Sequence, residues 1–552
     1  MVQSQQSAPA GKLSPDMADS PPSSPEPRDS RGERCEVDER DESDERDERE
    51  VSEEAEPASA IATNRALWGW LILCFSTGPT SGMVNNYVTA SIQSAANAVG
   101  HVPGTNQPCA RRGAINCVVK LGGTNVDYLS YLLYLRAISR GVEGVVSILT
   151  AGAADYSNYR KPMMMGSIYL FGMLALPFAG LTRQTYSNLN AMATLYILLT
   201  VVSGVYTVIE ASYVPIFMRS VGWSRPTRRL ETVAASGYQS RKSWVKGSRV
   251  SVLGLVSGNV GALVALLIGV IITYSRGSAI REGYHNFLLA ITIAGCLTIV
   301  FAILGQILLP SVPGQPRPKG RWAFLLPLRN WIKLLGSVRQ YPNAFKLCIG
   351  WILWNTGYSN FLQLLGSLFL ETSGIQRGSG LFTVYSFITI ICACVGSLAW
   401  LFALPYTRFH IKLWAYLFLA VNIVCVFWGC LGISNSIPIG YKHMAEFWVA
   451  IVIFMSTSSA LRSLNRVLFA SLIPKGSEAL YFGLEITLDL ATGWINPLVQ
   501  GVIQNRTHNL RFPMIPNLIL MVLALGLYLW TDMEKGMQDA ETPLIQATHS
   551  ED

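Results

Sequence analysis

The stretch LIPKGSEALYFGLE, residues 472–485, decides how the rest of the chain is interpreted. It joins two long apolar runs through a tight turn at Pro474, Lys475 and Gly476, and it places a carboxylate, Glu485, inside the second run. A run of about 20 apolar residues is long enough to cross a bilayer as a helix. A charged group near the centre of such a helix costs at least about 2.5–3.5 kcal/mol. The carboxylate is therefore tolerable only where cations meet it.

The whole chain follows the pattern of this stretch. Half of its 552 residues are hydrophobic and only 14% are charged, and the apolar residues gather in runs of bilayer-spanning length. The sequence therefore predicts an all-α, polytopic membrane protein with about twelve transmembrane helices in two six-helix bundles. The predicted spans are 66–90, 127–150, 162–181, 190–217, 250–274, 285–309, 347–370, 380–404, 412–433, 446–470, 480–503 and 514–531.

These runs divide the chain into five parts. Residues 1–64 form a disordered acidic tail, 65–309 an N-terminal six-helix bundle, 310–346 a Pro-rich basic linker, 347–531 a C-terminal six-helix bundle and 532–552 a second tail. Disorder is expected at the start because a stretch this polar cannot bury enough apolar surface to offset the cost of ordering it.

The distribution of charge predicts the orientation. The first 60 residues hold 7 of the 43 Lys and Arg but 18 of the 35 Asp and Glu, so the membrane body is strongly basic. With both termini in the cytosol, most of its cations fall on cytosolic loops, as the positive-inside rule requires. Because these cations flank apolar spans, we expect a lipid bilayer as the partner and no nucleic acid.

Two features of the outer loops agree with this orientation. The one glycosylation sequon, at Asn505, falls on an outer loop, where it could be used. Cys109 and Cys117 share another outer loop. They form a disulfide if that loop faces an oxidising lumen and stay free thiols otherwise.

Charged residues recur inside the predicted spans, often one helical turn apart. Residues four apart share a helix face, so two arginines of the tenth span and two carboxylates of the eleventh each present a common face. Such intramembrane charges mark functional sites by default. They are Arg136, Arg140 and Glu143 in the second span, Glu210 in the fourth, Arg462 and Arg466 in the tenth, and Glu485 and Asp489 in the eleventh.

Two interpretations of the last four remain open. Arg462 and Arg466 either pair permanently with Glu485 and Asp489, fixing two neighbouring helices, or form a gate whose ion pairs break and reform. Arg140 and Glu143 are close enough in sequence for a local helix pair.

Arg136 and Glu210 lack a local partner, which makes them candidates for contact with substrate. We expect protons to accompany the substrate, with Glu210 or Glu143 as their carrier. Asn85, Asn355 and Asn360 lie in Gly-interrupted spans of the two halves. Broken helices offer backbone donors and acceptors to a zwitterion such as an amino acid, although such residues also hydrogen-bond between helices.

Other classes of function find no support. The chain has no Walker loop, no GxSxG elbow and no histidine pair at zinc spacing, so we expect no enzymatic activity, no cofactor and no metal. Gly254, Gly258 and Gly261 in the fifth span predict close helix packing rather than binding.

The loop AGAADYSNYRKP, residues 151–162, resembles the signature loop of the major facilitator superfamily, in which an acidic residue precedes a pair of cations. Asp155, Arg160 and Lys161 match by role, but the spacing is one residue longer and the usual Gly after the Asp is missing. The resemblance implies a latch in which Asp155 pairs with cations while the transporter faces one way.

The region after the tenth span is similar to that of the fungal autophagy-related protein 22 family. The likeness covers the chain from about residue 65 onward. Tyr481 replaces a second Phe, and Glu485 stands where an aromatic residue is expected. The matching residues are Arg462, Pro474, Lys475, Gly476, Glu478, Phe482, Gly483, Asp489, Trp494 and Pro497.

This resemblance implies a transporter of the vacuole membrane. It would release amino acids, leucine and other large neutral ones, from autophagic breakdown into the cytosol during nitrogen starvation. Two alternatives remain: a major facilitator transporter of another small solute, and a non-transporting membrane receptor or scaffold.

Overall fold

The computed structural model describes residues 63–541, except 103, 105–108, 110–116, 155, 220–235, 276–279, 313–335, 374–379, 408, 435, 475–477, 494, 508 and 510. The acidic tail up to residue 62, most of the linker and the last eleven residues thus lie outside the described part. So does the turn at Lys475.

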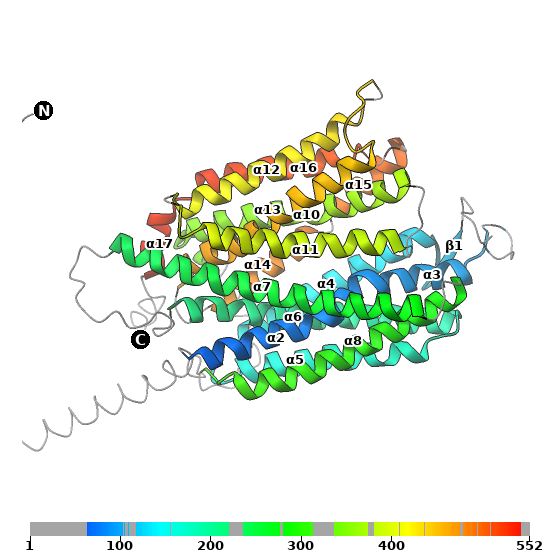
Figure 1. Ribbon diagram of the computed structural model, residues 1–552, viewed down its shortest axis with the longest axis horizontal. Helices are drawn as coiled ribbons and strands as arrows, with labels where there is room; N and C mark the ends of the chain where they lie inside the picture. The colour runs from blue at the N-terminus through cyan, green and yellow to red at the C-terminus, as the bar shows by residue number, and fades with distance from the viewer. Residues whose placement is uncertain are drawn as a thin grey trace, which may run out of the picture. The chain divides into compact units, whose positions relative to one another are not determined.

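Long helices make up the first half of the chain (Figure 1). The first span is interrupted after Pro79, where a π-helical turn separates two α-helices; such turns occur where the regular hydrogen-bond ladder is disturbed. The elements are α2 (Asn64–Met83), η1 (Val84–Val88), α3 (Thr89–Val99), α4 (Tyr128–Ala154), α5 (Arg160–Ala175), η2 (Leu176–Gly180), α6 (Tyr186–Arg219), α7 (Ser236–Ser275) and α8 (Ile280–Leu308).

The second half repeats this construction. The predicted eleventh span is divided into two helices, one ending at Gly493 and the other beginning at Ile495. The elements are η3 (Ser337–Arg339), α10 (Pro342–Ser373), α11 (Gly380–Ala403), α12 (Ile411–Leu431), α13 (Met444–Ser471), α14 (Glu478–Gly493), α15 (Ile495–Thr507), α16 (Met514–Trp530) and α17 (Met533–Glu541).

Every predicted span falls on one of these helices or helix pairs. Within the described residues, seven helices are long and apolar enough to cross a membrane, and an eighth is added if the bent pair of α16 and α17 counts as one span. The positions are therefore as predicted, while the number of twelve spans stays a prediction.

Buried side chains gather in two hydrophobic clusters. One runs from Ala66 to Leu309, the N-terminal bundle. The other draws almost entirely on residues from Tyr341 to Met533, the C-terminal bundle, but it also takes in Ala211, Met218 and Val252. The two bundles therefore share buried contacts through α6 and α7.

Glycines bring α2 and α7 into backbone contact inside the N-terminal bundle. A Cβ atom added to Gly261 would lie 2.3 Å from the Phe75 carbonyl oxygen, and one on Gly254 would lie 2.3 Å from the Trp70 ring. The close packing predicted for these glycines is confirmed.

Several helix ends meet at one end of the bundles, which we call the basic end. There the Lys161 amine donates to the Leu309 carbonyl at 2.6 Å and Arg65 donates to the Ile307 carbonyl at 3.4 Å, while Lys412 donates to the Thr531 carbonyl. Cations suit these positions because the last carbonyls of a helix lack intrahelical partners.

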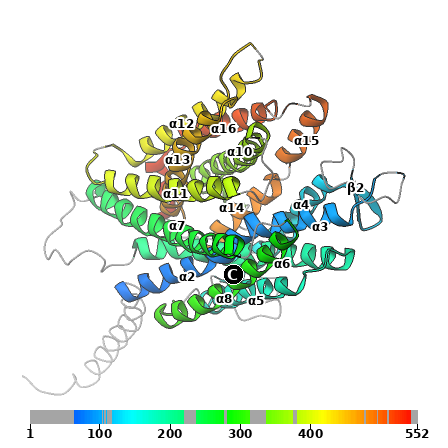
Figure 2. The same ribbon diagram turned by 45° about the vertical axis from the view of Figure 1, so that its right-hand side comes forward.

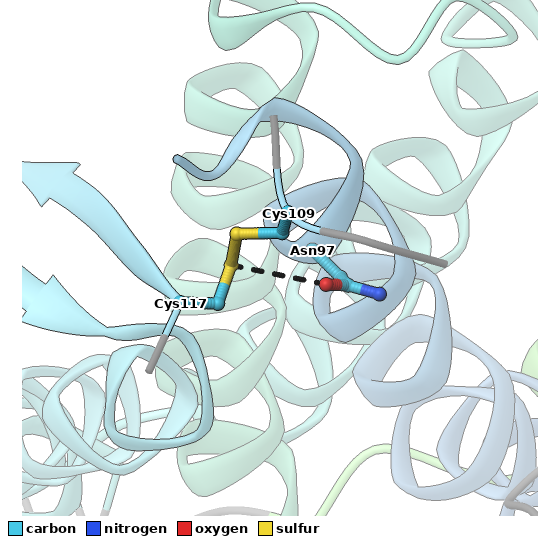
Figure 3. Close-up of a disulfide and its surroundings, with 3 residues drawn as sticks. All are labelled: Asn97, Cys109 and Cys117. Atoms are coloured by element: carbon cyan, nitrogen blue, oxygen red, sulfur yellow. Dashed lines mark hydrogen bonds between the residues drawn. A yellow bond between two sulfur atoms is a disulfide. The ribbon is translucent and has the colours of Figure 1, made fainter. Parts of the chain in front are cut away.

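The opposite end, which we call the disulfide end, carries a short antiparallel hairpin of β1 (Val118–Leu121) and β2 (Thr124–Asp127). Just before it, Cys109 and Cys117 are joined in a disulfide, and the Asn97 side chain of α3 faces this bond (Figure 3). The bond fastens the hairpin to the end of the first helical segment.

Candidate functional site

The charged residues of the spans lie where the two bundles meet. α14 packs against α4 and α6, and α13 packs against α6 and α7. Figure 2 shows α14 beside α4, whereas α15 lies on the side of α10 and α16. α14 therefore contacts helices of both bundles.

Three residues of the C-terminal bundle form a polar chain within this contact. The Arg462 guanidinium of α13 donates to the Asn355 amide oxygen at 3.1 Å. The Asn355 amide nitrogen of α10 in turn donates to Asp489 of α14 at 3.0 Å. A neutral amide thus separates a cation from an anion, and all three side chains are half-buried.

Aromatic rings flank this chain along α10. The Arg462 guanidinium lies over the Tyr358 ring, 5.1 Å from its centroid, in cation–π geometry. Tyr358 stacks on Trp354 at 5.1 Å and on Phe454 at 5.7 Å. These rings hold the guanidinium in place and supply apolar surface beside it.

An ion pair of the N-terminal bundle faces the polar chain. Arg140 and Glu143 on α4 are 3.2 Å apart, and this is the one ion pair within 4 Å in which both partners are described residues. The predicted local pair is confirmed. Glu143 is buried in a notch where α6 has Gly204 instead of a side chain.

Arg140 also connects the bundles. Its side chain is 56% exposed yet lies within electrostatic range of Asp489 on α14. The Arg140 side chain is therefore exposed at this contact rather than enclosed by it. The charges then alternate from Glu143 through Arg140 and Asp489 to Arg462.

A second group of charges lies one turn away. Arg466 of α13 is within electrostatic range of Glu485 on α14 and of Glu210 on α6. Glu210 is also within electrostatic range of Cys74 on α2, and one oxygen of the buried Glu485 carboxylate has no hydrogen-bond partner among the described residues. Arg466 thus lies between carboxylates of opposite bundles.

This arrangement differs from the permanent pairs considered from the sequence. Among the described residues, no ion pair within 4 Å joins α13 to α14. Arg462 reaches Asp489 only through Asn355, and Arg466 is shared between Glu485 and Glu210. Spacing along each helix placed the charges on common faces but could not show that a third helix would enter between them.

The remaining candidates do not join these groups. Arg136 is half-buried on α4, and it makes no ion pair within 4 Å with another described residue. Asn85 is exposed in η1. Asn360 is buried and donates to Thr356 of its own helix at 2.9 Å, which is the structural role that such residues often have.

The residues of the signature loop have separate positions. Asp155 lies outside the described residues, so the predicted latch stays a prediction. Arg160 is buried near the Tyr213 ring, and Lys161 caps the end of α8. Asn505 falls within α15, but its side chain lies outside the described part.

Cys74 and the tryptophans of α10 were not among the site residues predicted from the sequence. Trp351, Trp354 and Tyr358 follow one another at intervals of three and four, which places them on one helix face. That spacing could have revealed the aromatic row. Within the described residues, no group of three His, Cys, Asp or Glu could hold a metal.

The chain is similar in sequence to the proteins of one family. The model of the family described as "Vacuole effluxer Atg22 like" matches residues 62–541. Autophagy-related protein 22 of Candida albicans is 45% identical over 470 residues, 85% of this chain and 90% of the relative. That of Candida glabrata is 24% identical over 503 residues, 86% of this chain and 91% of the relative.

Solved transporters share the fold. The proton:xylose symporter XylE matches with a TM-score of 0.57 and 12% identity, over 87% of this chain and 96% of its own. The major facilitator superfamily transporter FucP matches with a TM-score of 0.54 and 11% identity, over 84% and 98%. At such identities the likeness shows the fold alone, which is that of the major facilitator superfamily.

Proposed function

Because this chain belongs to the Atg22-like family of vacuole effluxers and has the fold of major facilitator transporters, we propose that it releases amino acids from the vacuole into the cytosol. Leucine and other large neutral amino acids from autophagic degradation are the proposed substrates, and nitrogen starvation is the condition of use. The chain is thus a membrane transporter and not an enzyme.

One observation carries the proposal: charges alternate across the contact between the bundles. Arg140 of α4 lies within electrostatic range of Asp489 of α14, and Arg466 of α13 lies within that range of Glu210 of α6. Electrostatic contacts between half-exposed groups are weak enough to break and reform, which suits two bundles that rock about a midplane site.

Proton coupling is the second part of the proposal. Glu143 and Glu210 are the two carboxylates that the N-terminal bundle contributes, and each has a basic neighbour, Arg140 and Arg466. Arg466 belongs to the other bundle, so Glu210 loses this cation when the bundles separate and then takes up a proton more readily, whereas Glu143 keeps Arg140 on its own helix. Movement of the bundles would then drive proton binding and release.

The test uses the purified full chain in proteoliposomes. We expect uptake of radiolabelled leucine, stimulated when the source compartment is made acidic, and abolition of that stimulation in Glu210→Gln or Glu143→Gln. Empty liposomes and the exposed-site variant Glu534→Gln are the controls. If uptake does not respond to an imposed pH gradient and both variants take up leucine normally, transport is not coupled to protons.

Two further measurements test the substrate and the location. A null strain starved for nitrogen should retain leucine in its vacuoles and lose the excess when the gene is returned. A panel of sugars and drugs should fail to compete with leucine for uptake. Loss of function on deletion of residues 1–60, with leucine flux intact, would instead favour a scaffold.

A further inference from the structure

The polar chain of Arg462, Asn355 and Asp489 has the shape of an occupied amino-acid site. Asn355 accepts from a guanidinium through its oxygen and donates to a carboxylate through its nitrogen. A free α-amino acid offers the same two functions on adjacent carbons, and in charged form. Its carboxylate would accept from the guanidinium, and its ammonium would donate to Asp489.

Both charged residues keep capacity for such a ligand. Within the described part of the chain, Asn355 uses one oxygen of Asp489 and one terminal nitrogen of Arg462. A carboxylate accepts through two oxygens and a guanidinium donates five N–H groups. Both side chains are half-buried rather than sealed, and the neighbouring Arg140 side chain is exposed, so a ligand can reach them.

The neighbouring rings favour the same ligand. Tyr358 holds the Arg462 guanidinium by its face, which leaves the N–H edge free to meet a carboxylate. Since charge-assisted hydrogen bonds are about twice as strong as neutral ones, a zwitterion gains more here than the Asn355 amide does.

We propose that Arg462 and Asp489 bind the carboxylate and the ammonium of a free α-amino acid, with Asn355 setting the distance between them. This inference rests on the proposed function and adds the residues that recognise the two charged groups of the substrate. Sugars and compounds with only one of the two charges would leave one of these residues unpaired, which is how a site rejects near-analogues.

The position of Arg140 links binding to movement. Arg140 of the N-terminal bundle is within electrostatic range of Asp489, and the other cation within that range is Arg462 of the C-terminal bundle. A substrate ammonium on Asp489 replaces Arg140 as the counter-ion. Binding therefore weakens an attraction between the bundles, and an empty site restores it.

The experiment compares leucine with two analogues that each lack one charge. Isoamylamine is leucine without its carboxylate, and 4-methylpentanoate is leucine without its ammonium. The readout is inhibition of [³H]leucine counterflow in proteoliposomes that hold the wild type, Asp489→Asn, Arg462→Gln or the exposed control Glu534→Gln. Ratios of inhibition constants do not depend on the fraction of folded protein.

In the wild type, both analogues should inhibit at least about tenfold more weakly than leucine, because each forgoes a hydrogen bond to a charged group. Asp489→Asn should erase the preference for leucine over 4-methylpentanoate but keep that over isoamylamine. Arg462→Gln should do the reverse, and Glu534→Gln should change neither ratio.

The outcomes are distinguishable. If wild-type protein exchanges leucine but both ratios survive both substitutions, the site is elsewhere, and this inference fails while amino-acid transport stands. If the wild type exchanges no amino acid at all, the proposed function fails and this inference falls with it.

Discussion

Two helix contacts in this protein differ in the residues that form them: one is lined by glycines and the other by charged side chains. Between α2 and α7, inside the N-terminal bundle, glycines remove side chains so that backbones touch, with Gly78 against Gly258 and Gly261 against Phe75. Between α4 and α14, across the bundles, Arg140 faces Asp489 and keeps half of its surface open to water.

The difference indicates which contact moves. Backbone-to-backbone packing has one geometry and loses its dispersion energy with any displacement. Screened charges change little in energy over small distances, and their partners can be exchanged for water or for a ligand. The glycine contact therefore keeps each bundle rigid, and the charged contact lets the bundles separate.

The largest effect should follow from breaking the rigid contact. In Gly261→Ala the new Cβ would lie 2.3 Å from a backbone oxygen that cannot move alone. Overpacking of this kind costs typically about 1–3 kcal/mol, and more where backbones must shift. We expect a marked fall in the thermal unfolding midpoint in detergent and little correctly inserted transporter.

Gly258→Ala is the matched control on the same helix. The nearest atom to its added Cβ is the Cys74 carbonyl oxygen at 3.4 Å, an ordinary contact. It should unfold near the wild-type temperature. Alanine favours a helix over glycine at both positions, so equal losses in the two variants would mean that the close approach at Gly261 is not what decides the stability of α7.

The next effect concerns the cation shared between bundles. Arg466→Gln removes the cation that lies within electrostatic range of both Glu210 and Glu485, two carboxylates of opposite bundles. Removing one partner of a buried charge pair costs about 3–5 kcal/mol, and we take about 2–3 because Arg466 is half-buried. Leucine transport should therefore fall about 30- to 150-fold.

A second substitution identifies the cause of that loss. Adding Glu485→Gln to Arg466→Gln removes one uncompensated carboxylate, so part of the transport should return, and Arg466→Lys should keep most of it. If the double variant is as inactive as the single, Arg466 acts through its shape or through substrate rather than through these carboxylates.

Most of the fold could be predicted from the sequence because the bilayer fixes helix length. Runs of about 20 apolar residues mark their own positions, and the described helices follow them. The break between α14 and α15 was not predicted. It follows Gly493, but a glycine within an apolar run also occurs in unbroken α7, so composition alone cannot locate it.

The site was only half predictable, for a related reason. Helical periodicity shows which charges share a face, as for Arg462 with Arg466. It does not show what lies opposite that face. The insertion of Asn355 before Asp489 and the reach of Arg466 to Glu210 depend on which helices pack together, and that information is absent from local spacing.

A smaller effect should come from the charge that faces the substrate site. Arg140→Gln removes the cation that competes for Asp489. The Michaelis constant for leucine should therefore fall a few-fold. The maximal rate should fall by about tenfold, because Glu143 loses its partner and the bundles lose an attraction. Initial rates over a leucine titration separate the two parameters.

Arg183→Gln, on the exposed connection between η2 and α6, controls for loss of a positive charge as such and should leave both parameters unchanged. A raised Michaelis constant with an unchanged maximal rate in Arg140→Gln would show that Arg140 binds substrate directly, and the competition drawn above would be wrong.

The smallest effect compares two serines of α7 that make the same kind of bond in the two kinds of contact. The Ser251 hydroxyl donates to the Ser463 carbonyl of the other bundle at 2.9 Å, and the Ser257 hydroxyl donates to the Leu71 carbonyl of its own bundle at 2.7 Å. Each bond contributes about 1 kcal/mol. Ser251→Ala should therefore shift the equilibrium about fivefold toward separation of the bundles at the basic end, whereas Ser257→Ala should lower only the unfolding midpoint. Distances between spin labels at Asn158 and Lys535, both exposed at that end, would report the shift, and equal distance distributions in the two variants would mean that the contact between bundles is as rigid as the contact within one.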